Sequence, residues 1–356
     1  MTSIKVKVPT RIDLAGGTID LWPLHTLMNR AATVNVGITV FQKAEVNLNQ
    51  DSNMIRVVSK DLNQGFETSF DEITAGSDLP LVRALIKEFW DSDLCGFSLE
   101  TSCESPAGAG LGGSSCLSIA IASALTYARA EAEGKEAIID ERRLVATVQN
   151  LEARIINAPT GCQDYWGGVR GRVNILDFKN SGMEIETFHD DTVKDLLDEH
   201  MIVAYSGKSR DSAMNNWQIF KNVFDGDKEA LGILTQIGEL GFLVGEALKA
   251  QDVMAALDLS EKEWSVRKQL WAGIETKETK AIDTAAKNAG AIFSRVCGAG
   301  GGGVMVIFCK PEVRKEVCSA IEAEGATVMN ASISSEGISV QAKKHKLEKV
   351  EPAQFV

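Results

Sequence analysis

The chain is 356 residues long, which is long for a single hydrophobic core and comfortable for two domains of ordinary size. Its 44% hydrophobic and 24% charged residues are typical of a soluble globular protein and exclude a disordered or fibrous chain. With 37 basic and 49 acidic residues the net charge is −12, which argues against nucleic acid or an anionic membrane as the main partner.

The sequence lacks the features of an export signal or a membrane span. Its first eight residues contain no apolar core and no cleavage site. The most apolar run, residues 116–128, is about half the length needed to cross a bilayer. The seven cysteines are odd in number and scattered, which predicts reduced thiols used as small apolar residues. We therefore expect a cytoplasmic protein, either a monomer or a homodimer.

The first half of the sequence mixes strand and helix patterns. Strands are predicted where apolar and polar residues alternate or β-branched residues cluster, at residues 3–8, 32–48, 54–58, 66–70, 96–103 and 168–178. Helices are predicted at residues 80–91, 114–133 and 140–156.

The second half is mainly helical at first and then mixed. Helical patterns dominate residues 211–290, with breaks near Gly226, Gln251 and Thr276. The remaining predicted elements are strands at 291–296 and 303–309, a helix at 311–324 and strands near 326–341. Strands mixed with helices in both halves predict an α+β fold with two domains. We expect these domains to cover residues 1–185 and 186–356.

A glycine-rich loop, residues 106–115, lies between a predicted strand and a predicted helix. Glycines let the backbone approach a ligand closely, and the helix directs its positive end and free N–H groups at the same point. A polyphosphate requires this arrangement. The candidate binding residues are Pro106, Gly108, Gly110, Leu111, Gly112, Gly113, Ser114 and Ser115. The alternative is a glycine turn followed by a serine helix cap.

Two other phosphate-binding patterns are less well supported. Residues 108–113 match Gly-x-Gly-x-x-Gly with Glu131 downstream, as in dinucleotide-binding folds. However, the preceding strand alternates polar and apolar residues, whereas a central strand of a doubly wound sheet is apolar throughout. Residues 207–209, Gly-Lys-Ser, imitate the end of a P-loop, but Ile202 stands where that loop needs a glycine.

A second glycine run, residues 298–303, lies between two predicted strands. Five glycines in six positions carry an entropy cost that an ordinary hairpin turn does not offset. We expect this loop to pack against a ligand or against the first glycine loop.

The motifs at residues 9–20, 106–115 and 298–303 resemble, in order, the three motifs of the galactokinase, homoserine kinase, mevalonate kinase and phosphomevalonate kinase (GHMP) family. Glu152 and residues 160–168 resemble the family's metal-ligand helix and catalytic-aspartate segment. The resemblance covers roughly residues 5–310. It implies a ribosomal S5-like N-terminal domain and a ferredoxin-like C-terminal domain, with the active site between them.

Within the family, the sequence is most similar to the sugar kinases that act on heptose 7-phosphate and on fucose. This similarity lies in residues 11–17, 163–165 and 205–210, and in Glu263-Trp264 followed by Arg267-Lys268. It implies ATP-dependent phosphorylation of a hydroxyl group on a small sugar or sugar phosphate, with Mg²⁺ as the metal ion.

The resemblance also implies a role for each motif residue. Asp164 accepts the proton of the attacking hydroxyl, and Arg11 steadies that carboxylate and the charge on the transferred group. Ser114 and Glu152 hold Mg²⁺, which prefers oxygen ligands. The implied substrate-binding residues are Asp20, Gly16, Gly17, Gly300 and Gly301.

Each of these assignments has a plainer alternative. Arg11 and Asp13 can form a surface ion pair, Glu152 can be an exposed helix residue, and Asp164 can cap the turn before the glycines at 167 and 168. The tryptophans at positions 22 and 166 can stack on a sugar or pack in the core.

The sequence departs from the family pattern at several positions. Gly113 replaces the first serine of the usual pair, Cys162 replaces a lysine, Arg295 replaces a lysine, and residues 17–20 alter the first motif. Losing basic groups argues mildly against a substrate that already carries a phosphate. Four other cations can supply the missing charge: Arg170, Arg172, Lys208 and Arg210.

Two other functions remain open from the sequence. One is a kinase or decarboxylase of the mevalonate branch, or an amino-acid alcohol kinase, whose substrates carry a carboxylate. The other is a non-enzymatic sensor that keeps the binding pocket. The four histidines show no metal-ligand spacing and none lies beside a motif serine, which argues against a metal hydrolase or a nucleophilic triad.

Overall fold

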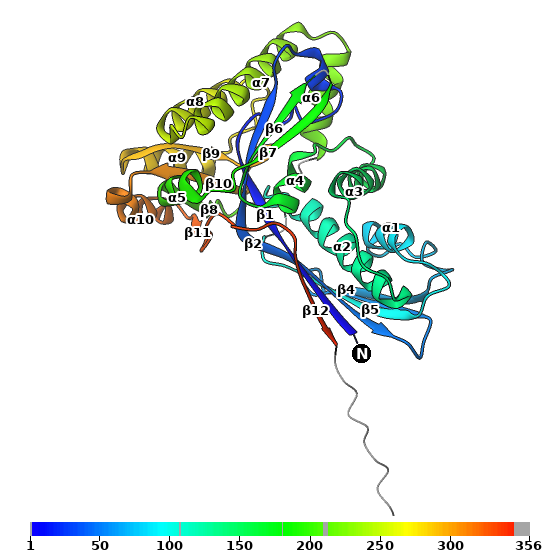
Figure 1. The fold of residues 1–356 in the computed structure, drawn as a ribbon. Helices are drawn as coiled ribbons and strands as arrows, with labels where there is room; N and C mark the ends of the chain where they lie inside the picture. The colour runs from blue at the N-terminus through cyan, green and yellow to red at the C-terminus, as the bar shows by residue number, and fades with distance from the viewer. Residues whose placement is uncertain (1, 107, 180, 209–212, 345–356) are drawn as a thin grey trace, which may run out of the picture.

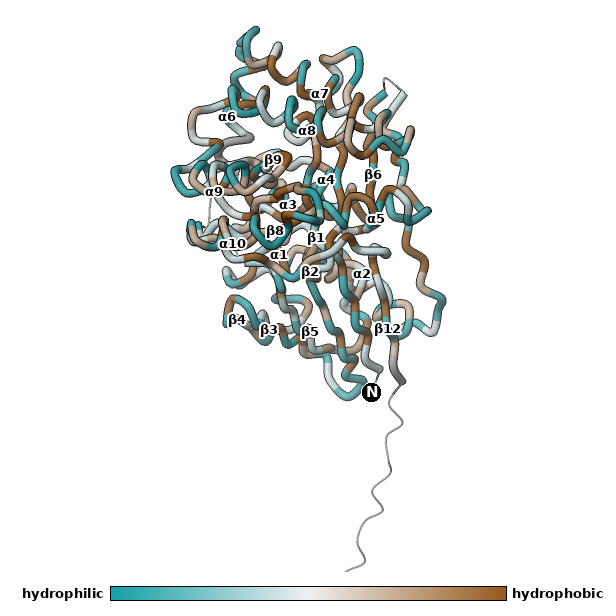
Figure 2. Tube along the Cα trace, turned by 90° about the vertical axis from the view of Figure 1, so that its left-hand side faces the viewer, coloured by the Kyte–Doolittle hydropathy of each residue, from teal (hydrophilic) through white to brown (hydrophobic). Residues whose placement is uncertain are grey.

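The computed structural model describes residues 2–106, 108–179, 181–208 and 213–344. Within them the chain forms two β-sheets with helices packed against both, the α+β arrangement that the sequence predicts (Figure 1). Hydrophobic stretches run through the central strands and the helices that face them, and the outer loops are more hydrophilic (Figure 2).

The larger sheet has eight strands in the order β12-β1-β2-β5-β3-β4, with β6 paired to β2 and β7 paired to β6. The strands are β1 Thr2–Ala15, β2 Ala32–Asn49, β3 Met54–Ser59, β4 Gln64–Ser69, β5 Gly96–Cys103, β6 Val173–Lys179, β7 Gly182–Thr187 and β12 Ser339–Lys344. Because β12 pairs with β1, the last described strand lies in the same sheet as the first. The domain division at 185/186 stays a prediction.

Strand β1 changes character along its length. Its first part has the exposed Lys5 between buried neighbours, whereas every residue from Val8 to Ala15 is buried. The pairing of β1 with β2 shifts register twice in this second part, between Pro9 and Thr10 and again between Asp13 and Ala15. Such bulges bend a strand and redirect its side chains. The buried half of β1 therefore brings charged side chains into the interior.

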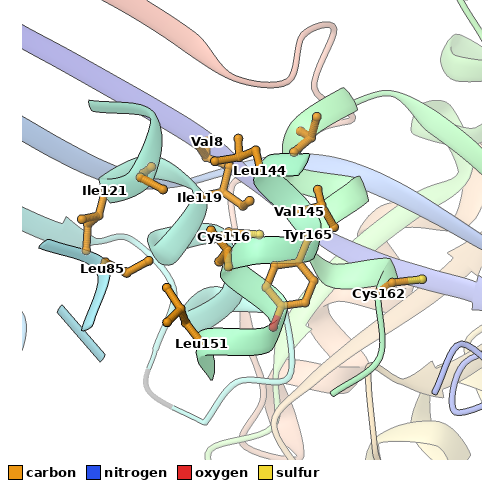
Figure 3. Close-up of a cluster of buried hydrophobic side chains, with 14 of the residues drawn as sticks. Val8, Leu85, Cys116, Ile119, Ile121, Leu144, Val145, Leu151, Cys162 and Tyr165 are labelled. Carbon is orange, nitrogen blue, oxygen red and sulfur yellow. The ribbon is translucent and has the colours of Figure 1, made fainter. Parts of the chain in front are cut away.

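Four helices, α1 Pro80–Phe89, α2 Gly113–Glu133, α3 Glu141–Ile156 and α4 Gln163–Arg170, form a layer next to β1 and β2. The central helix is α2, which is surrounded by the other three and has buried side chains on all sides. A helix in that position has no need of a polar stripe. Figure 3 shows Cys116 and Ile119 of α2 close to Tyr165 of α4 and to Leu144 and Leu151 of α3.

Helix α4 occupies the segment where the sequence indicates that a strand begins at residue 168, so that boundary is wrong. Two glycines explain the helix. A Cβ atom on Gly167 would lie 2.7 Å from Cβ of Arg11, and one on Gly168 would lie 2.8 Å from Cγ1 of Val8. The glycines therefore let α4 lie directly on β1 instead of breaking the helix, and β6 begins only at Val173.

The smaller sheet has four antiparallel strands in the order β11-β8-β10-β9. They are β8 Met201–Tyr205, β9 Ala291–Val296, β10 Val304–Cys309 and β11 Thr327–Val328, with helices α5 Asp191–His200, α9 Lys277–Asn288 and α10 Arg314–Ala323 around them. Strand β8 lies in a segment for which the sequence predicts no element. All six residues of β10 are buried, as expected for a central strand.

Three helices, α6 Ala213–Phe224, α7 Lys228–Lys249 and α8 Val253–Arg267, occupy most of the predicted helical region. The predicted breaks near Gly226, Gln251 and Thr276 are confirmed. Among the described helices, only α7 is long and apolar enough to cross a membrane, but Leu234, Ile237 and Val244 of this helix are buried in the protein core. Helices α7 and α8 contact β1, and α8 also contacts β9, so they connect the two sheets.

Candidate active site

A cavity of about 650 Å³ lies between the glycine-rich loop, the buried half of β1 and the facing ends of α3 and α4. Most predicted site residues line it: Arg11, Asp20, Pro106, Gly108, Gly110, Leu111, Gly112, Gly113, Ser114, Ser115, Glu152 and Asp164. The volume is typical of sites for small molecules and cofactors.

Gly112 forms the junction between the glycine-rich loop and α2. Its φ is +70°, and a Cβ atom there would lie 2.9 Å from both Cβ and Cγ of Asp164. Only glycine fits both the backbone conformation and the close approach. Gly112 is also the N-cap of α2 and makes no side-chain cap hydrogen bond. The first N–H groups of a 21-residue helix therefore face the cavity, where they favour an anion.

Arg11 holds one oxygen of the Asp164 carboxylate. Its Nε donates to Oδ1 of Asp164 at 2.7 Å, its Nη2 donates to the same oxygen, and its Nη1 donates to the Gly110 carbonyl at 2.7 Å. Burial alone would lower the pKa of Arg11, but Asp164 and Asp13 raise it above its usual range, so the guanidinium stays charged. Oδ2 of Asp164 has no hydrogen-bond partner among the described residues and faces Gly112.

Glu152 is buried on α3 and accepts two hydrogen bonds at Oε2. The donors are Oγ of Ser115 at 2.9 Å and the hydroxyl of Tyr165 at 2.6 Å. Burial, together with the nearby Glu152, raises the pKa of Tyr165 above its usual range, so the phenol remains a donor. The side chain of Ser114 is exposed and faces the cavity instead. The alternative of Glu152 as an exposed helix residue is therefore wrong.

Asp20 lies at the other end of the cavity and is 4% exposed. Its Oδ2 accepts a hydrogen bond of 2.9 Å from the backbone N–H of Gln163. A Cβ atom on Gly161 would lie 2.1 Å from this oxygen, so Gly161 makes room for the carboxylate. Burial, with a further contribution from Asp164, raises the pKa of Asp20 to about 6.

A buried ion network behind the cavity was not foreseen from the sequence. Arg295 of β9 bonds to Asp13 at 2.9 Å and to Glu263 of α8 at 3.0 Å, and Arg267 bonds to Glu263 at 2.6 Å. Asp13 also lies 3.8 Å from Arg11, so the alternative of a surface Arg11–Asp13 pair is wrong. Burial alone would raise the pKa of Asp13, but Arg295 and Arg11 lower it, so this carboxylate is charged.

The same network holds the loop after β1. Arg267 donates from Nη2 to the Gly17 carbonyl at 2.7 Å and from Nη1 to Oγ1 of Thr18 at 3.2 Å. The N–H of Gly16 donates to Glu263 at 3.0 Å. Thr18 lines the cavity with a φ of +70°, a conformation that non-glycine residues rarely adopt. The sequence signal for this network is the run Glu263-Trp264 followed by Arg267-Lys268, which carries the resemblance to the sugar kinases but was given no role there.

Four predicted substrate-binding glycines do not line the cavity. A Cβ atom on Gly16 would lie 2.0 Å from the Ala32 carbonyl oxygen, and Gly17 lies beside Arg267. Gly300 packs on Ile274, and Gly301 faces Trp271. These glycines support the loops around the cavity.

The second glycine loop packs against the first, as the sequence predicts. The N–H of Val304 donates to the Ala109 carbonyl at 2.7 Å, and a Cβ atom on Gly303 would lie 2.5 Å from that oxygen. Of the two tryptophans weighed for sugar stacking, Trp166 is buried in the core and Trp22 is 72% exposed.

Two family models match the chain. The model described as GHMP kinases N terminal domain matches residues 79–172, and the model described as GHMP kinases C terminal matches residues 246–327. Both glycine loops fall within the matched regions.

Curated relatives match nearly the whole chain. The D-glycero-alpha-D-manno-heptose 7-phosphate kinase of Campylobacter jejuni is 24% identical over 350 residues, covering 95% of this chain and 98% of the relative. The mevalonate kinase of Thermococcus onnurineus is 26% identical over 313 residues, covering 81% and 85%. A crystal structure of a putative sugar kinase from Campylobacter jejuni has the same fold, with a TM-score of 0.72, 20% identity and coverage of 96% and 98%.

Proposed function

This chain belongs to the GHMP kinase family, and on that basis we propose that it transfers the γ-phosphoryl group of ATP to a hydroxyl group of a small sugar or sugar phosphate. The observation that carries the proposal is the position of Asp164. One of its oxygens is fixed by Arg11, and the other faces the glycine loop from which α2 begins. Phosphoryl transfer depends on such positioning and on charge stabilisation more than on covalent chemistry.

The first glycine loop is the proposed site for the triphosphate. Positive φ angles at Gly108, Gly110 and Gly112 turn the backbone toward the cavity, and α2 adds its free N–H groups. An anion held by backbone groups is compatible with a net charge of −12, because the interaction is local.

Glu152, Ser114 and Ser115 are the proposed ligands for Mg²⁺. No three histidine, cysteine, aspartate or glutamate side chains come together as a metal site in the part of the chain that the structure describes. A carboxylate with neighbouring hydroxyls nevertheless fits an ion that takes most of its ligands from phosphates and water. When bound, Mg²⁺ supplies charge neutralisation on the phosphate oxygens. Ser115 is the hydroxyl in direct contact with Glu152, and Ser114 is the one directed to the cavity.

Asp164 is the proposed base. Its free oxygen, Oδ2, accepts the proton of the acceptor hydroxyl while the acceptor oxygen bonds to the γ-phosphorus and the bond to the β,γ-bridging oxygen breaks. The products are the phosphorylated acceptor and ADP, and the proton passes from Asp164 to solvent. Arg11 keeps the carboxylate in position and adds positive charge near the transferred group.

A second candidate is phosphorylation of a hydroxy acid. It is favoured by the 26% identity to the mevalonate kinase of Thermococcus onnurineus. The proposed base and phosphate site serve either acceptor, so the two candidates differ only in what the Asp20 end of the cavity binds.

A single variant tests the proposed base. Asp164→Asn should lower kcat in a coupled ADP-release assay by about 10²–10⁴-fold, the usual contribution of a positioned acid or base. Binding of Mg·ATP, followed by calorimetry, should persist. Asp71→Asn, an exposed carboxylate in a turn outside the cavity, is the matched control. Unchanged turnover in Asp164→Asn would remove the proposed base.

A further inference from the structure

The Asp20 end of the cavity offers hydrogen-bond acceptors. Gln163 is 6% exposed and lines the cavity, and its Oε1 has no hydrogen-bond partner among the described residues. Asp20 and Asp164 add two carboxylates. The Gln163 N–H donates to Oδ2 of Asp20 and Arg11 donates to Oδ1 of Asp164, which leaves Oδ2 of Asp164 without a hydrogen-bond partner among the described residues. A hydroxyl group can donate to such acceptors. A phosphate dianion or a carboxylate has no proton to donate.

The charges of the side chains around the Asp20 end of the cavity do not sum to zero. Arg11, Arg267 and Arg295 carry three positive charges, and Asp13, Glu263 and Asp164 carry three negative charges in the same continuous network. These six charges cancel, so Asp20 leaves this end of the cavity with a net negative charge, and Glu152 and Asp61 elsewhere in the lining add to it. Because its pKa is raised to about 6 by burial, Asp20 is ionised at neutral pH and above. A second anion beside Asp20 would meet repulsion in a buried site.

No spare cation lines the cavity among the described residues. Arg11 is the cation present there, and Asp164 and Asp13 already engage it. The cations that the sequence offered for a substrate phosphate form ion pairs elsewhere, Arg170 with Glu141 at 2.5 Å, Arg172 with Asp191 at 2.9 Å and Lys208 with Glu278 at 2.6 Å. Arg210 lies outside the described residues. Cys162 is buried with its Sγ 3.7 Å from Sδ of Met183, and it adds no positive charge to the cavity.

We propose that the acceptor is an uncharged polyol, a free sugar that carries neither a phosphate nor a carboxylate before the reaction. This inference rests on the phosphoryl transfer proposed above and selects among its acceptors. It separates this chain from the phosphorylated heptose in the name of the Campylobacter jejuni relative and from the hydroxy acid of the mevalonate kinases. Under this proposal Asp20 also acts on the product. The product carries a phosphate that the acceptor lacked, and repulsion between Asp20 and this phosphate favours dissociation of the product.

Matched acceptor pairs test this proposal. ADP release would be measured with free hexoses and heptoses, with the 6- or 7-phosphate of each, and with mevalonate. We expect kcat/KM for the free sugars to exceed that for their phosphates by about a hundred-fold or more, as expected for one like charge about 5 Å away at an effective dielectric constant of about 20. Equal or reversed preference, or turnover of mevalonate alone, would overturn this proposal and leave phosphoryl transfer standing. No ADP release with any acceptor would overturn both.

A variant that removes the charge of Asp20 gives a second test. Its readout is a ratio of two kcat/KM values measured on the same protein, which partial unfolding would not change. Asp20→Asn should reduce the ratio of kcat/KM for free sugar to that for its phosphate by about ten-fold or more, because it removes one negative charge from this end of the cavity. Asp61→Asn removes one charge from the same cavity at the turn between β3 and β4, and it should leave this ratio within about two-fold. An equal change of the ratio in both variants, or no change in Asp20→Asn, would contradict the role of Asp20.

Discussion

The hydroxyl of Ser115 donates a hydrogen bond of 2.9 Å to the Glu152 carboxylate, and this contact joins the first turn of α2 to α3. Ser114, one residue earlier, has its side chain exposed. Successive helical residues differ in direction by about 100°, so adjacent hydroxyls serve different neighbours. Of the two serines, Ser115 is therefore the one that orients the Glu152 carboxylate, the proposed metal ligand.

Ser115→Ala should therefore weaken the response to magnesium. Removing a hydrogen bond to a charged group costs about 1.5–3 kcal/mol, so the Mg²⁺ concentration for half-maximal activity should rise by about ten-fold or more. Ser118→Ala is the matched control, because its hydroxyl lies one turn further along α2, outside the cavity lining, and donates to the Ser114 carbonyl instead of to Glu152. An equal increase in Ser118→Ala and Ser115→Ala would contradict the role of the contact between Ser115 and Glu152.

Gly112→Ala should lower turnover strongly at a modest cost in stability. Its φ of +70° costs an alanine about 1–2 kcal/mol, and the new Cβ would displace Asp164 from its position. We expect kcat to fall by about a hundred-fold or more, since small misplacements of reacting groups have effects of this size.

Gly134→Ala is the matched control for Gly112→Ala. Gly134 ends the same helix with a φ of +66°, and its Cβ position has no atom within 4 Å. Gly134→Ala should lose similar stability in urea unfolding and keep its turnover. Equal turnover losses in the two alanine variants would mean that backbone strain, and not the contact with Asp164, causes the defect.

Arg267→Met should destabilise the protein and weaken acceptor binding. Removing Arg267 leaves Glu263 with Arg295 as its remaining charged partner, so the cost in urea unfolding should approach the value of about 3–5 kcal/mol for a broken buried ion pair. Because Arg267 holds the Gly17 carbonyl and Thr18, KM for the acceptor should rise more than KM for ATP. Arg267→Lys keeps the charge without the planar fork and should recover stability only in part.

Arg129 and Glu133 provide the control for this pair, because they have the same i,i+4 spacing on α2 but are partly exposed. Arg129→Met should cost less than about 1 kcal/mol. If the two methionine variants lost the same free energy of unfolding, burial would not be the source of the effect.

Asp20 should make stability depend on pH with a sign opposite to that of most carboxylates. Its pKa is about 6 in the folded chain and 3.8 in the reference state, so the folded chain binds the proton more tightly. The stabilising contribution is present below pH 3.8 and is lost as pH rises through 6. Asp20→Asn should remove this loss and increase the free energy of unfolding at pH 8 by about 3 kcal/mol.

The same substitution should reduce turnover, because the amide no longer presents an ionised acceptor to the substrate. Urea unfolding at pH 5 and pH 8 measures the effect in both proteins. An Asp20→Asn variant that is less stable than the parent chain at pH 8 would show that the carboxylate is stabilised by contacts and not penalised by burial.

The sequence contained most of the cavity because its residues lie in contiguous motifs. Arg11, Asp20, Glu152 and Asp164 each line it, although they come from three separate segments. What the sequence could not predict depends on contacts between distant segments. The choice between Ser114 and Ser115 depends on the phase of α2 relative to α3, which no local pattern encodes.

The buried network escaped prediction for a related reason. Glu263 and Arg267 have the spacing of an ordinary surface pair on a helix, and only the approach of Arg295 and Asp13 makes them part of the interior. Helix α4 was misjudged because glycines are poor helix formers, and the close contact with β1 that requires them lies more than 150 residues away in sequence.

The pairing of Arg295 with Asp13 restricts how the molecule can open. Each side chain is fully enclosed, one belongs to the smaller sheet and the other to the larger. A hinge motion between the sheets would have to break this buried pair, and breaking a buried ion pair costs several kcal/mol. We therefore expect reactants and products to enter and leave by local movement of the loops at the rim of the cavity, with the contact between the two sheets kept.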